Sequence, residues 1–332
     1  MTISFKTNTP VNVFSPLSII ATEMEAVDAV INERLRSDIP MINGVLNYLF
    51  STPGKRLRPS VLLLTAGALG FRGIQKYNLA AVVEFIHAAT LIHDDVVDES
   101  NMRRGNPTAN ETFGNAASVL VGDFLYSRAF QIMVEAKDLR VLSALAEATN
   151  VIAEGEVLQL MNIHNAALTT EEYLSVIRSK TAKLFEASAR VGALVAQASP
   201  LQEQLCADYG QAIGVAYQII DDILDYEGDP EKTGKNVGDD LREGKTTLPL
   251  ILAMEQSSAE DKQLIQTAIE GGHIDLLPEV LEIIYKTGSL DLAHEIAGQE
   301  GVKAKLAAQN LPVNDYTKSM VIIAQELLQR KK

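Results

Sequence analysis

The sequence predicts an all-α fold in a single large domain, and three observations support this. Apolar residues recur at helical spacing along most of the 332 residues. Ala, Leu, Ile, Val and Glu fill the sequence, whereas aromatic residues make up only 5% and Trp is absent. No segment shows the alternation of faces that is typical of strands, and no repeat of solenoid period is present. We therefore expect a helical bundle with a substantial core.

The N-terminal half divides into a short lead and several predicted helices. Residues 1–16 are polar and contain two prolines, so we expect a flexible lead, followed by one helical domain over 17–332. The helices predicted in this half have apolar positions at helical spacing and end at Pro, Gly or a polar segment. They cover 17–49 with a break at Pro40, 59–69 with a stop at Gly70, 78–98, and 115–135. The helix at 78–98 is almost wholly apolar up to His93, which predicts a central position in the bundle.

The second half continues the helical pattern with one exception. Predicted helices cover 139–161, 170–198, 201–226, and 249–254, and further helices follow to Arg330. Thr169 or Thr170, with Glu172 close behind, resembles an N-cap with an acidic first turn. The exception is 227–247, which is rich in Gly, Asp and Lys and has little apolar periodicity. We interpret this segment as a mobile functional loop.

Charge and cysteine content exclude some functions. The net charge of −14 argues against nucleic acid as a partner, because nucleic-acid binding requires a basic face that neutralises phosphates. The single cysteine, Cys206, excludes an internal disulfide and is typical of a reducing compartment. The sequence shows no secretory signal and no uncharged stretch long enough to span a membrane. We expect a cytoplasmic protein that could still touch a membrane surface.

Two acidic motifs carry most of the functional information. DDVVD at 94–98 and DDILD at 221–225 each place carboxylates at positions i, i+1 and i+4. Side chains four residues apart share a helix face, with Cβ atoms about 5–6 Å apart, and like charges so placed repel each other. Mg²⁺ supplies a reason for such pairs, since it is bound by carboxylates together with substrate phosphates. The alternative is a solvated acidic helix end, and the repetition of the motif after apolar residues argues against it.

Basic residues lie near these motifs in the sequence. Lys55, Arg56 and Arg58 occupy a turn that enters a helix, where backbone N–H groups and guanidinium groups attract anions. A solvated basic turn is the alternative reading of so short a segment. Further cations follow at Arg103, Arg104, Lys180, Lys235 and Lys245. Six aspartates with several cations predict a diphosphate substrate held through metal, and the basic turn predicts a second anion bound without metal.

The chain resembles the trans-polyprenyl diphosphate synthases, in which two DDxxD motifs face each other across a helical cavity. The resemblance covers nearly the whole chain and rests on seven segments. These are GKRLRP at 54–59, HAATLIHDDVVDESNMRRG at 87–105, GDFLYSRAF at 122–130, EGEVLQL at 154–160, SKTAKLFEA at 179–187, YQIIDDILDY at 217–226 and GKNVGDDLREGKTTLPL at 234–250. Within the family the chain is most similar to the bacterial octaprenyl diphosphate synthases that make the side chain of ubiquinone or menaquinone. The resemblance implies a helical bundle around a deep central cavity.

The resemblance also implies roles for the matching residues. Asp94 and Asp98 would bind Mg²⁺ ions that hold the allylic diphosphate, and Asp221 would bind a third Mg²⁺ from the opposite wall. Supporting roles fall to Asp95, Asp222 and Asp225. The expected ligands of the allylic diphosphate are Arg103, Lys180, Lys235 and Lys245, and those of isopentenyl diphosphate are Lys55, Arg58, His87 and Arg104. Thr181 and Gln218 would direct oxygen dipoles at the developing allylic cation.

The implied activity is the successive addition of isopentenyl diphosphate to an allylic diphosphate such as farnesyl diphosphate. Product length would depend on where the growing tail stops. Ala89 and Thr90 lie about one turn before Asp94, and small residues there leave the tunnel open and predict a long product. Phe130 and Met133 on a neighbouring helix are candidates for a deeper floor. Octaprenyl diphosphate is the predicted product.

Three other functions share some of these features. A medium-chain synthase, making geranylgeranyl to heptaprenyl products, differs only in tunnel depth. A non-catalytic partner subunit of a heteromeric synthase typically has eroded aspartate motifs, whereas both motifs are intact here. A terpene cyclase has no use for a second diphosphate site. The resemblance further implies a homodimer, and release of the product at a membrane surface is compatible with it.

Overall fold

The computed structural model describes residues 15–51, 54–103, 105–227 and 237–327. The predicted lead at 1–16 falls almost wholly outside these ranges. The elements of the first half are η1 Ser18–Ile20, α1 Ala21–Arg34, α2 Pro40–Ser51, α3 Leu57–Ala68, α4 Gln75–Val97, β1 Met102–Arg103, β2 Asn106–Pro107, α5 Ala109–Phe113, α6 Asn115–Glu135 and α7 Leu139–Met161. Those of the second half are α8 Thr170–Ile177, η2 Arg178–Ala182, α9 Lys183–Val195, α10 Pro200–Glu227, α12 Asp239–Arg242, α13 Leu248–Gln256, α14 Ala259–Gly271, η3 Ile274–Leu276, α15 Leu277–Thr287, α16 Ser289–Gln309 and α17 Asp315–Leu327.

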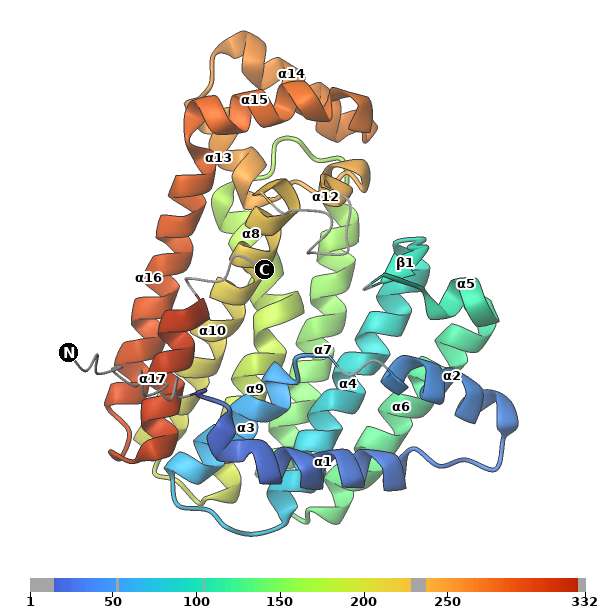
Figure 1. Cartoon of the computed structure of the whole chain (residues 1–332), viewed down its shortest axis with the longest axis vertical. Coiled ribbons are helices and arrows are strands. Elements are labelled where there is room, and N and C mark those ends of the chain that lie inside the picture. The colour runs from blue at the N-terminus through green and yellow to red at the C-terminus, as the bar shows by residue number, and fades with distance from the viewer. Residues whose placement is uncertain (1–14, 52–53, 104, 228–236, 328–332) are drawn as a thin grey trace, which may run out of the picture.

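The described residues form an all-α fold, as the sequence predicts. Long helices run side by side through the body of the molecule, and α1 crosses beneath them (Figure 1). The closest neighbours are α10 with α9 and α16, and α4 with α6. The middle of α4 is completely buried from Leu79 to Ile86 apart from slight exposure of Glu84. This confirms the central position that its apolar sequence predicts.

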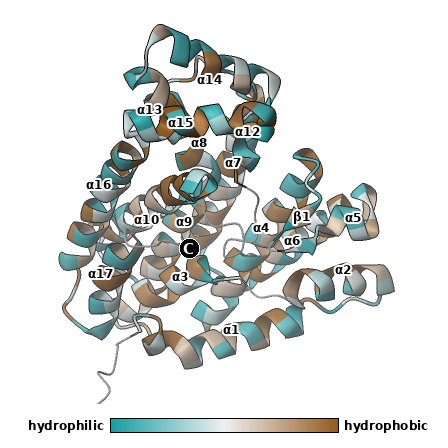
Figure 2. Cartoon of the chain, turned by 45° about the horizontal axis from the view of Figure 1, so that its top comes forward, coloured by the Kyte–Doolittle hydropathy of each residue, from teal (hydrophilic) through white to brown (hydrophobic). Residues whose placement is uncertain are grey.

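The core consists of two apolar clusters. The larger one joins α1, α2, α3, α4, α6, α7 and α9 to α10, α16 and α17. The smaller one joins the upper part of α10 to α8, α13, α14, α15 and α16. Figure 2 shows the apolar positions of these helices facing their neighbours and the hydrophilic positions facing outward. Helix α10 belongs to both clusters, so its upper end is held rigidly from several sides.

Several helix bounds agree with the sequence prediction, and four features differ. The helices at 115–135 and 139–161 begin and end where expected. The N-cap before α8 is Thr169, in a reciprocal capping box with Glu172. The helix predicted at 170–198 is instead interrupted by the π-helical turn η2. The other three differences are the short helix α5, the small antiparallel hairpin of β1 and β2, and the short helix α12 within the predicted loop. The separation of α1 from α2 agrees with the predicted break at Pro40.

The π-helical turn lies against α7 at a close approach of the two backbones. An added Cβ at Gly155 of α7 would lie 2.8 Å from the backbone nitrogen of Lys180, which is closer than atoms tolerate. Glycine is therefore required at this position for η2 to pack as it does. Single π-turns inside α-helices are frequent at functional sites, and this one carries both Lys180 and Thr181.

Candidate active site

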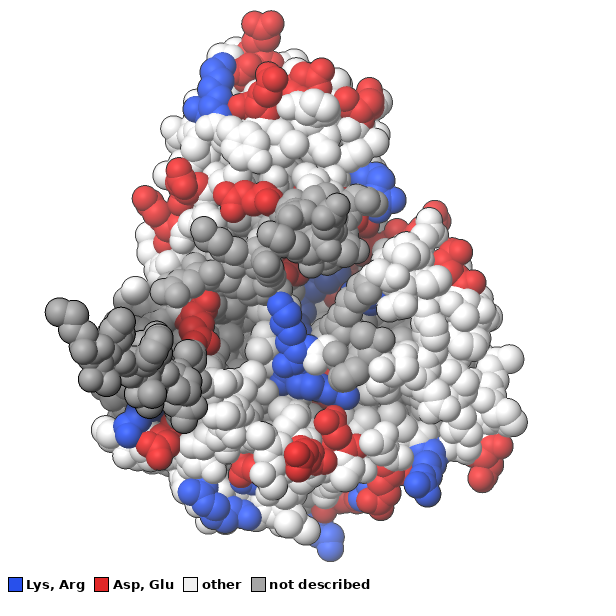
Figure 3. Space-filling view, in the orientation of Figure 1, with Lys and Arg blue, Asp and Glu red and all other residues white. Residues whose placement is uncertain are grey.

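The two acidic motifs lie at the upper ends of different helices. In the first motif, Asp94 and Asp95 lie in the last turn of α4, and Asp98 is the C-cap of that helix. The second motif, 221–225, lies in the last two turns of α10. The turn η2 connects the two sides, because Lys180 contacts Asp94 and Thr181 contacts Gln218 of α10. Lys and Arg side chains gather near the centre of the face shown in Figure 3, where the surface is hollowed. The structure therefore brings the predicted acidic and basic groups to one place.

Each aspartate of the first motif is paired with a cation. Asp94 Oδ2 lies 3.5 Å from Lys180 Nζ, and Asp98 Oδ2 lies 2.9 Å from Lys245 Nζ. Asp95 is 2% exposed and accepts hydrogen bonds from Arg103 Nε at 2.8 Å and Nη2 at 2.6 Å. These cations offset the repulsion between Asp94 and Asp98. Arg103 was predicted to contact a diphosphate directly, and in the structure its nearest partner is Asp95.

Burial and like charge both act on the groups around Asp94. Burial raises the pKa of Asp94, and Asp98 raises it further, while Lys180 opposes the shift. Burial alone would lower the pKa of Lys245, but Asp98 and Glu243 outweigh burial and raise it above its ordinary value. Lys245 therefore stays charged at neutral pH. Both lysines are suited to neutralise an anion that enters beside the carboxylates.

Two residues that the sequence analysis did not select surround Lys180. Glu156 Oε2 lies 2.5 Å from Lys180 Nζ, and Gln159 Oε1 accepts a hydrogen bond from the same nitrogen at 2.6 Å. Both come from α7, which packs against η2. Burial raises the pKa of Glu156 to about 7, with Asp94 adding to the shift and Lys180 opposing it. Glu156 and Gln159 are three residues apart and so share one face of the helix predicted at 139–161. That spacing is the feature of the sequence that could have identified them as a pair.

The unusual pKa of Glu156 gives a testable effect of pH on stability. Its pKa is higher in the folded chain than in the unfolded chain, so this group stabilises the fold below its unfolded pKa and stops doing so as pH rises through about 7. Gln cannot titrate. Between pH 5 and pH 8 in EDTA, we expect the wild type to lose about 2 kcal/mol more of unfolding free energy than Glu156→Gln.

Urea unfolding at the two pH values measures this difference. Glu154→Gln is the matched control, because Glu154 lies on the same helix but is exposed, and it accepts a hydrogen bond from Asn150 Nδ2 at 2.9 Å. The control should follow the wild type. If the unfolding free energies of Glu156→Gln and the wild type depended equally on pH, the raised pKa of Glu156 would be contradicted.

The second motif is held by a different kind of contact. Asp222 is 4% exposed; it accepts hydrogen bonds from Tyr173 Oη at 2.5 Å and from Gln218 Nε2 at 2.7 Å. Asp225 Oδ2 accepts the backbone N–H of Asp240 at 3.1 Å, which fastens α12 to α10. Burial raises the pKa of Asp222 to about 8, with Asp240 adding to the shift and the two hydrogen bonds opposing it. Asp221 is half-buried on the same face of α10 as Asp225.

The predicted basic turn lies at the start of α3. Arg58 Nη1 lies 3.0 Å from His87 Nε2, and its guanidinium stands over the Phe185 ring at 4.5 Å. Lys55 is exposed. The turn is fixed by Arg56, which has the left-handed φ of 50° and pairs with Glu84 at 2.5 Å. Arg56 therefore holds the backbone of the turn, a role that its spacing in the sequence did not indicate.

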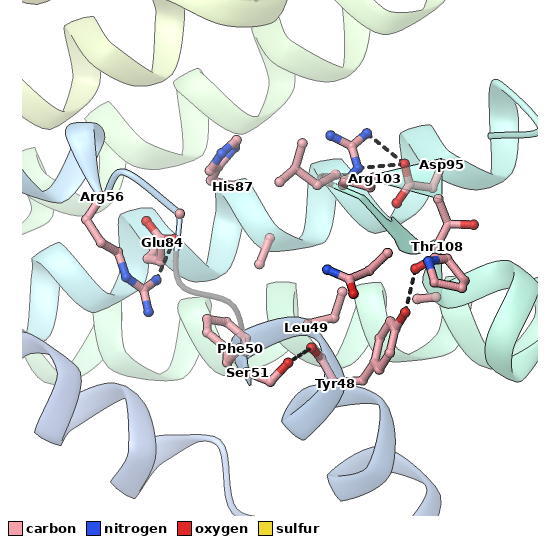
Figure 4. A pocket seen from close by; sticks show the side chains of 16 residues that line it. Tyr48, Leu49, Phe50, Ser51, Arg56, Glu84, His87, Asp95, Arg103 and Thr108 are labelled. Atoms are coloured by element: carbon pink, nitrogen blue, oxygen red, sulfur yellow. Dashed lines mark hydrogen bonds and ion pairs between the residues drawn. The ribbon is translucent and has the colours of Figure 1, made fainter. Parts of the chain in front are cut away.

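A pocket adjoins this turn and runs toward the first acidic motif. Figure 4 shows His87, Arg56 and Glu84 at one end and the Arg103–Asp95 pair at the other. Apolar side chains of α2, including Leu49 and Phe50, complete the lining. The pocket thus combines a cationic rim with an apolar wall, which suits a small diphosphate ester with a short hydrocarbon group.

The residues expected to set product length lie on α4 and α6. Ala89 is completely buried, and Thr90 donates a hydrogen bond to the carbonyl of His87 at 2.9 Å. Met133 is buried on the side of α6 that packs on α4, whereas Phe130 is 40% exposed in this chain. Only Met133 of these two therefore occupies an enclosed position. Arg104 and Lys235, predicted to contact the diphosphates, lie outside the described residues.

The aspartates offer the oxygen donors that Mg²⁺ prefers. The described residues contain no ready-made group of three or more His, Cys, Asp or Glu side chains positioned around one metal ion. The carboxylates of Asp94 and Asp98 are instead paired with the ammonium groups of Lys180 and Lys245. The donor chemistry of these carboxylates fits magnesium. Within the described ranges, none of the helices is both long and apolar enough to cross a membrane.

Comparisons with known proteins agree with this arrangement. A family model described as Polyprenyl synthetase matches residues 39–284. The chain is 50% identical to octaprenyl diphosphate synthase of Escherichia coli K12 over 313 residues, 94% of this chain and 97% of that one. It is 42% identical to an all-trans-nonaprenyl-diphosphate synthase of Rhodobacter capsulatus over 95% of this chain and 97% of that one. A polyprenyl synthase from Caulobacter crescentus, solved with calcium and isoprenyl diphosphate, superposes with a TM-score of 0.92 at 41% identity, covering 96% of this chain and 98% of that one.

Proposed function

The chain belongs to the polyprenyl synthetase family and is a prenyltransferase, and on that premise we propose that it makes octaprenyl diphosphate for a quinone side chain. It adds isopentenyl diphosphate units successively to an allylic diphosphate such as farnesyl diphosphate. One structural observation gives the main support for the location of the active site. The turn η2 contacts the first motif through Lys180 and α10 through Thr181, while Arg58 and His87 form a second cationic pair in contact with each other.

We propose that Asp94, Asp98 and Asp221 hold three Mg²⁺ ions, with Asp95, Asp222 and Asp225 in support. Magnesium bound there would neutralise negative charge on the leaving diphosphate and weaken the allylic C1–O bond. Lys180 and Lys245 stand beside the same carboxylates, so they can exchange a carboxylate partner for a diphosphate oxygen. Arg103 and Lys235 are assigned to the same allylic diphosphate. Divalent metal is supported by the calcium in the Caulobacter crescentus structure, and the number three rests on the family resemblance.

The reaction then proceeds on the organic substrates. As the allylic C1–O bond breaks, the diphosphate leaves with the electron pair and an allylic cation forms. Thr181 and Gln218 are hydrogen-bonded to each other and would present oxygen dipoles to that cation. The double bond of isopentenyl diphosphate, held by Lys55, Arg58, His87 and Arg104, attacks the cation. A proton is then lost to the departing diphosphate, and the product is a longer allylic diphosphate ready for another cycle.

An assay of purified protein tests this function. Radiolabelled isopentenyl diphosphate, farnesyl diphosphate and Mg²⁺ should give octaprenyl diphosphate as the main product. A product between geranylgeranyl and heptaprenyl would support a medium-chain synthase. No consumption of isopentenyl diphosphate by the protein alone would support a partner subunit. A cyclised hydrocarbon made without isopentenyl diphosphate would instead identify a terpene cyclase.

We also propose that the protein is a cytoplasmic homodimer, joined through α6 and α7. These neighbouring helices expose large apolar side chains, among them Leu120 and Val134 of α6 and Met161 of α7. Exposed apolar patches of this kind mark protein interfaces. The free, buried Cys206 fits a reducing compartment.

A charge on the proposed interface should separate the dimer. We expect Leu120→Glu to shift the sedimentation coefficient from that of a dimer to that of a monomer, because the carboxylate would be buried unpaired. Val313→Glu is the control, since Val313 is 88% exposed on another part of the chain. A dimer that survives Leu120→Glu at the same concentration would rule out this face.

A further inference from the structure

Four side chains form a continuous chain of hydrogen bonds beneath the proposed reaction site. Tyr173 Oη donates to Asp222 Oδ2 at 2.5 Å, and Gln218 Nε2 donates to Asp222 Oδ1 at 2.7 Å. Thr181 Oγ1 in turn donates to Gln218 Oε1 at 2.8 Å. Tyr173 comes from α8, far from the motifs in sequence, and none of the roles assigned above includes it.

This order of donors and acceptors fixes which way the Gln218 amide points. Asp222 Oδ1 accepts from the nitrogen of the Gln218 amide, and the oxygen of the same amide accepts from Thr181, so the two ends of the amide have different partners. The oxygen of Gln218 then faces Thr181, on the side where the allylic cation would form. With the amide reversed, both of these hydrogen bonds would be lost, and its nitrogen would replace its oxygen beside Thr181.

The orientation of Gln218 therefore depends on the position of Asp222, and Tyr173 holds that position. One oxygen of Asp222 is used by Gln218 and the other by Tyr173, so both ends of the carboxylate are fixed. Tyr173 is itself 4% exposed and lies in the first turn of α8, where the Thr169–Glu172 capping box fixes the backbone. Its hydroxyl has little freedom to move away.

We propose that Tyr173 is a positioning residue for allylic ionisation, which holds Asp222 so that the Gln218 amide directs its oxygen to the side shared with Thr181. This inference rests on the proposed prenyl transfer. It assigns Tyr173 no contact with substrate or metal, because its hydroxyl is engaged by Asp222.

The first test is Tyr173→Phe, which removes one oxygen and leaves the ring in place. We expect kcat to fall by about tenfold or more with farnesyl and isopentenyl diphosphates, because preoriented dipoles act on the transition state. The KM of both substrates should stay within about threefold of the wild type. Tyr209→Phe is the control, since Tyr209 is also a fully buried tyrosine and donates to the Met320 carbonyl at 3.1 Å, remote from the motifs. It should lower the melting temperature to a similar extent and leave kcat unchanged.

The second test asks whether Tyr173 acts through Gln218. In a Gln218→Ala background, Tyr173→Phe should change kcat by less than about twofold, because residues that act as a unit give non-additive effects. If Tyr173→Phe lowered kcat in the Gln218→Ala background as much as it does in the wild type, the proposal would be overturned. It would also be overturned if Tyr173→Phe changed only KM or only the Mg²⁺ concentration that gives half-maximal rate. An inactive wild type would instead refute the proposed function, so the two failures are distinguishable.

Discussion

Replacing Asp94 by Asn should lower kcat by roughly 10³-fold at saturating substrates, while the protein remains folded. The loss is expected because a neutral amide is a weak ligand for Mg²⁺, and metal stabilisation of a leaving group contributes several kcal/mol at about 1.4 kcal/mol per tenfold in rate. Lys180 keeps its contacts with Glu156 and Gln159 in this variant, so the fold of η2 should persist. Initial rates of isopentenyl diphosphate incorporation over a range of Mg²⁺ concentrations measure the effect.

A carboxylate away from the site provides the control for this loss. Asp208 lies on α10, is exposed, and accepts a hydrogen bond from Gln204 at 2.7 Å. Asp208→Asn should retain the wild-type rate. A variant Asp94→Asn that keeps more than a tenth of the wild-type kcat would show that Asp94 does not hold the metal that assists ionisation.

Enlarging Ala89 should shorten the product. Ala89 is completely buried on α4, about one turn before Asp94. We propose that the growing tail extends past this position, where a phenol ring would block it. We expect Ala89→Tyr, and likewise Ala89→Phe, to stop elongation several isoprene units early. Thin-layer or mass-spectrometric analysis of the dephosphorylated products gives their lengths.

Two checks make the result on Ala89 interpretable. Ala89→Ser adds one oxygen only and should leave the product length unchanged. Overpacking a buried position costs about 1–3 kcal/mol, so the melting temperature of Ala89→Tyr must show that it is folded at the assay temperature. A folded, active Ala89→Tyr enzyme with octaprenyl product would place the tunnel elsewhere.

The main helices could be predicted from the sequence because their apolar positions follow the helical period over many residues. Helices α6 and α7 illustrate this, since their observed bounds equal the predicted ones. The π-turn η2 could not be predicted, because it depends on how closely α7 approaches at Gly155. The hairpin of β1 and β2 was missed because each strand has only two residues.

The composition of the candidate site was also partly predictable. The aspartates and lysines stand in short motifs, and their types already indicate metal and diphosphate chemistry. Their partners are a matter of tertiary structure. Tyr173 and Asp222 are 49 residues apart, and Lys245 and Asp98 are 147 apart, so no local pattern connects them. Glu156 is absent from the predicted site residues, because its contact with the site is through Lys180 on another element.

We propose that the protein holds two diphosphates in different ways, one through metal and one through basic side chains alone. Isothermal titration calorimetry with and without EDTA tests it most directly. Isopentenyl diphosphate should bind in EDTA, and Arg58→Ala should abolish that binding, whereas the unreactive farnesyl thiodiphosphate should bind only when Mg²⁺ is present. Equal dependence of both ligands on Mg²⁺, or binding of both in EDTA, would contradict the account.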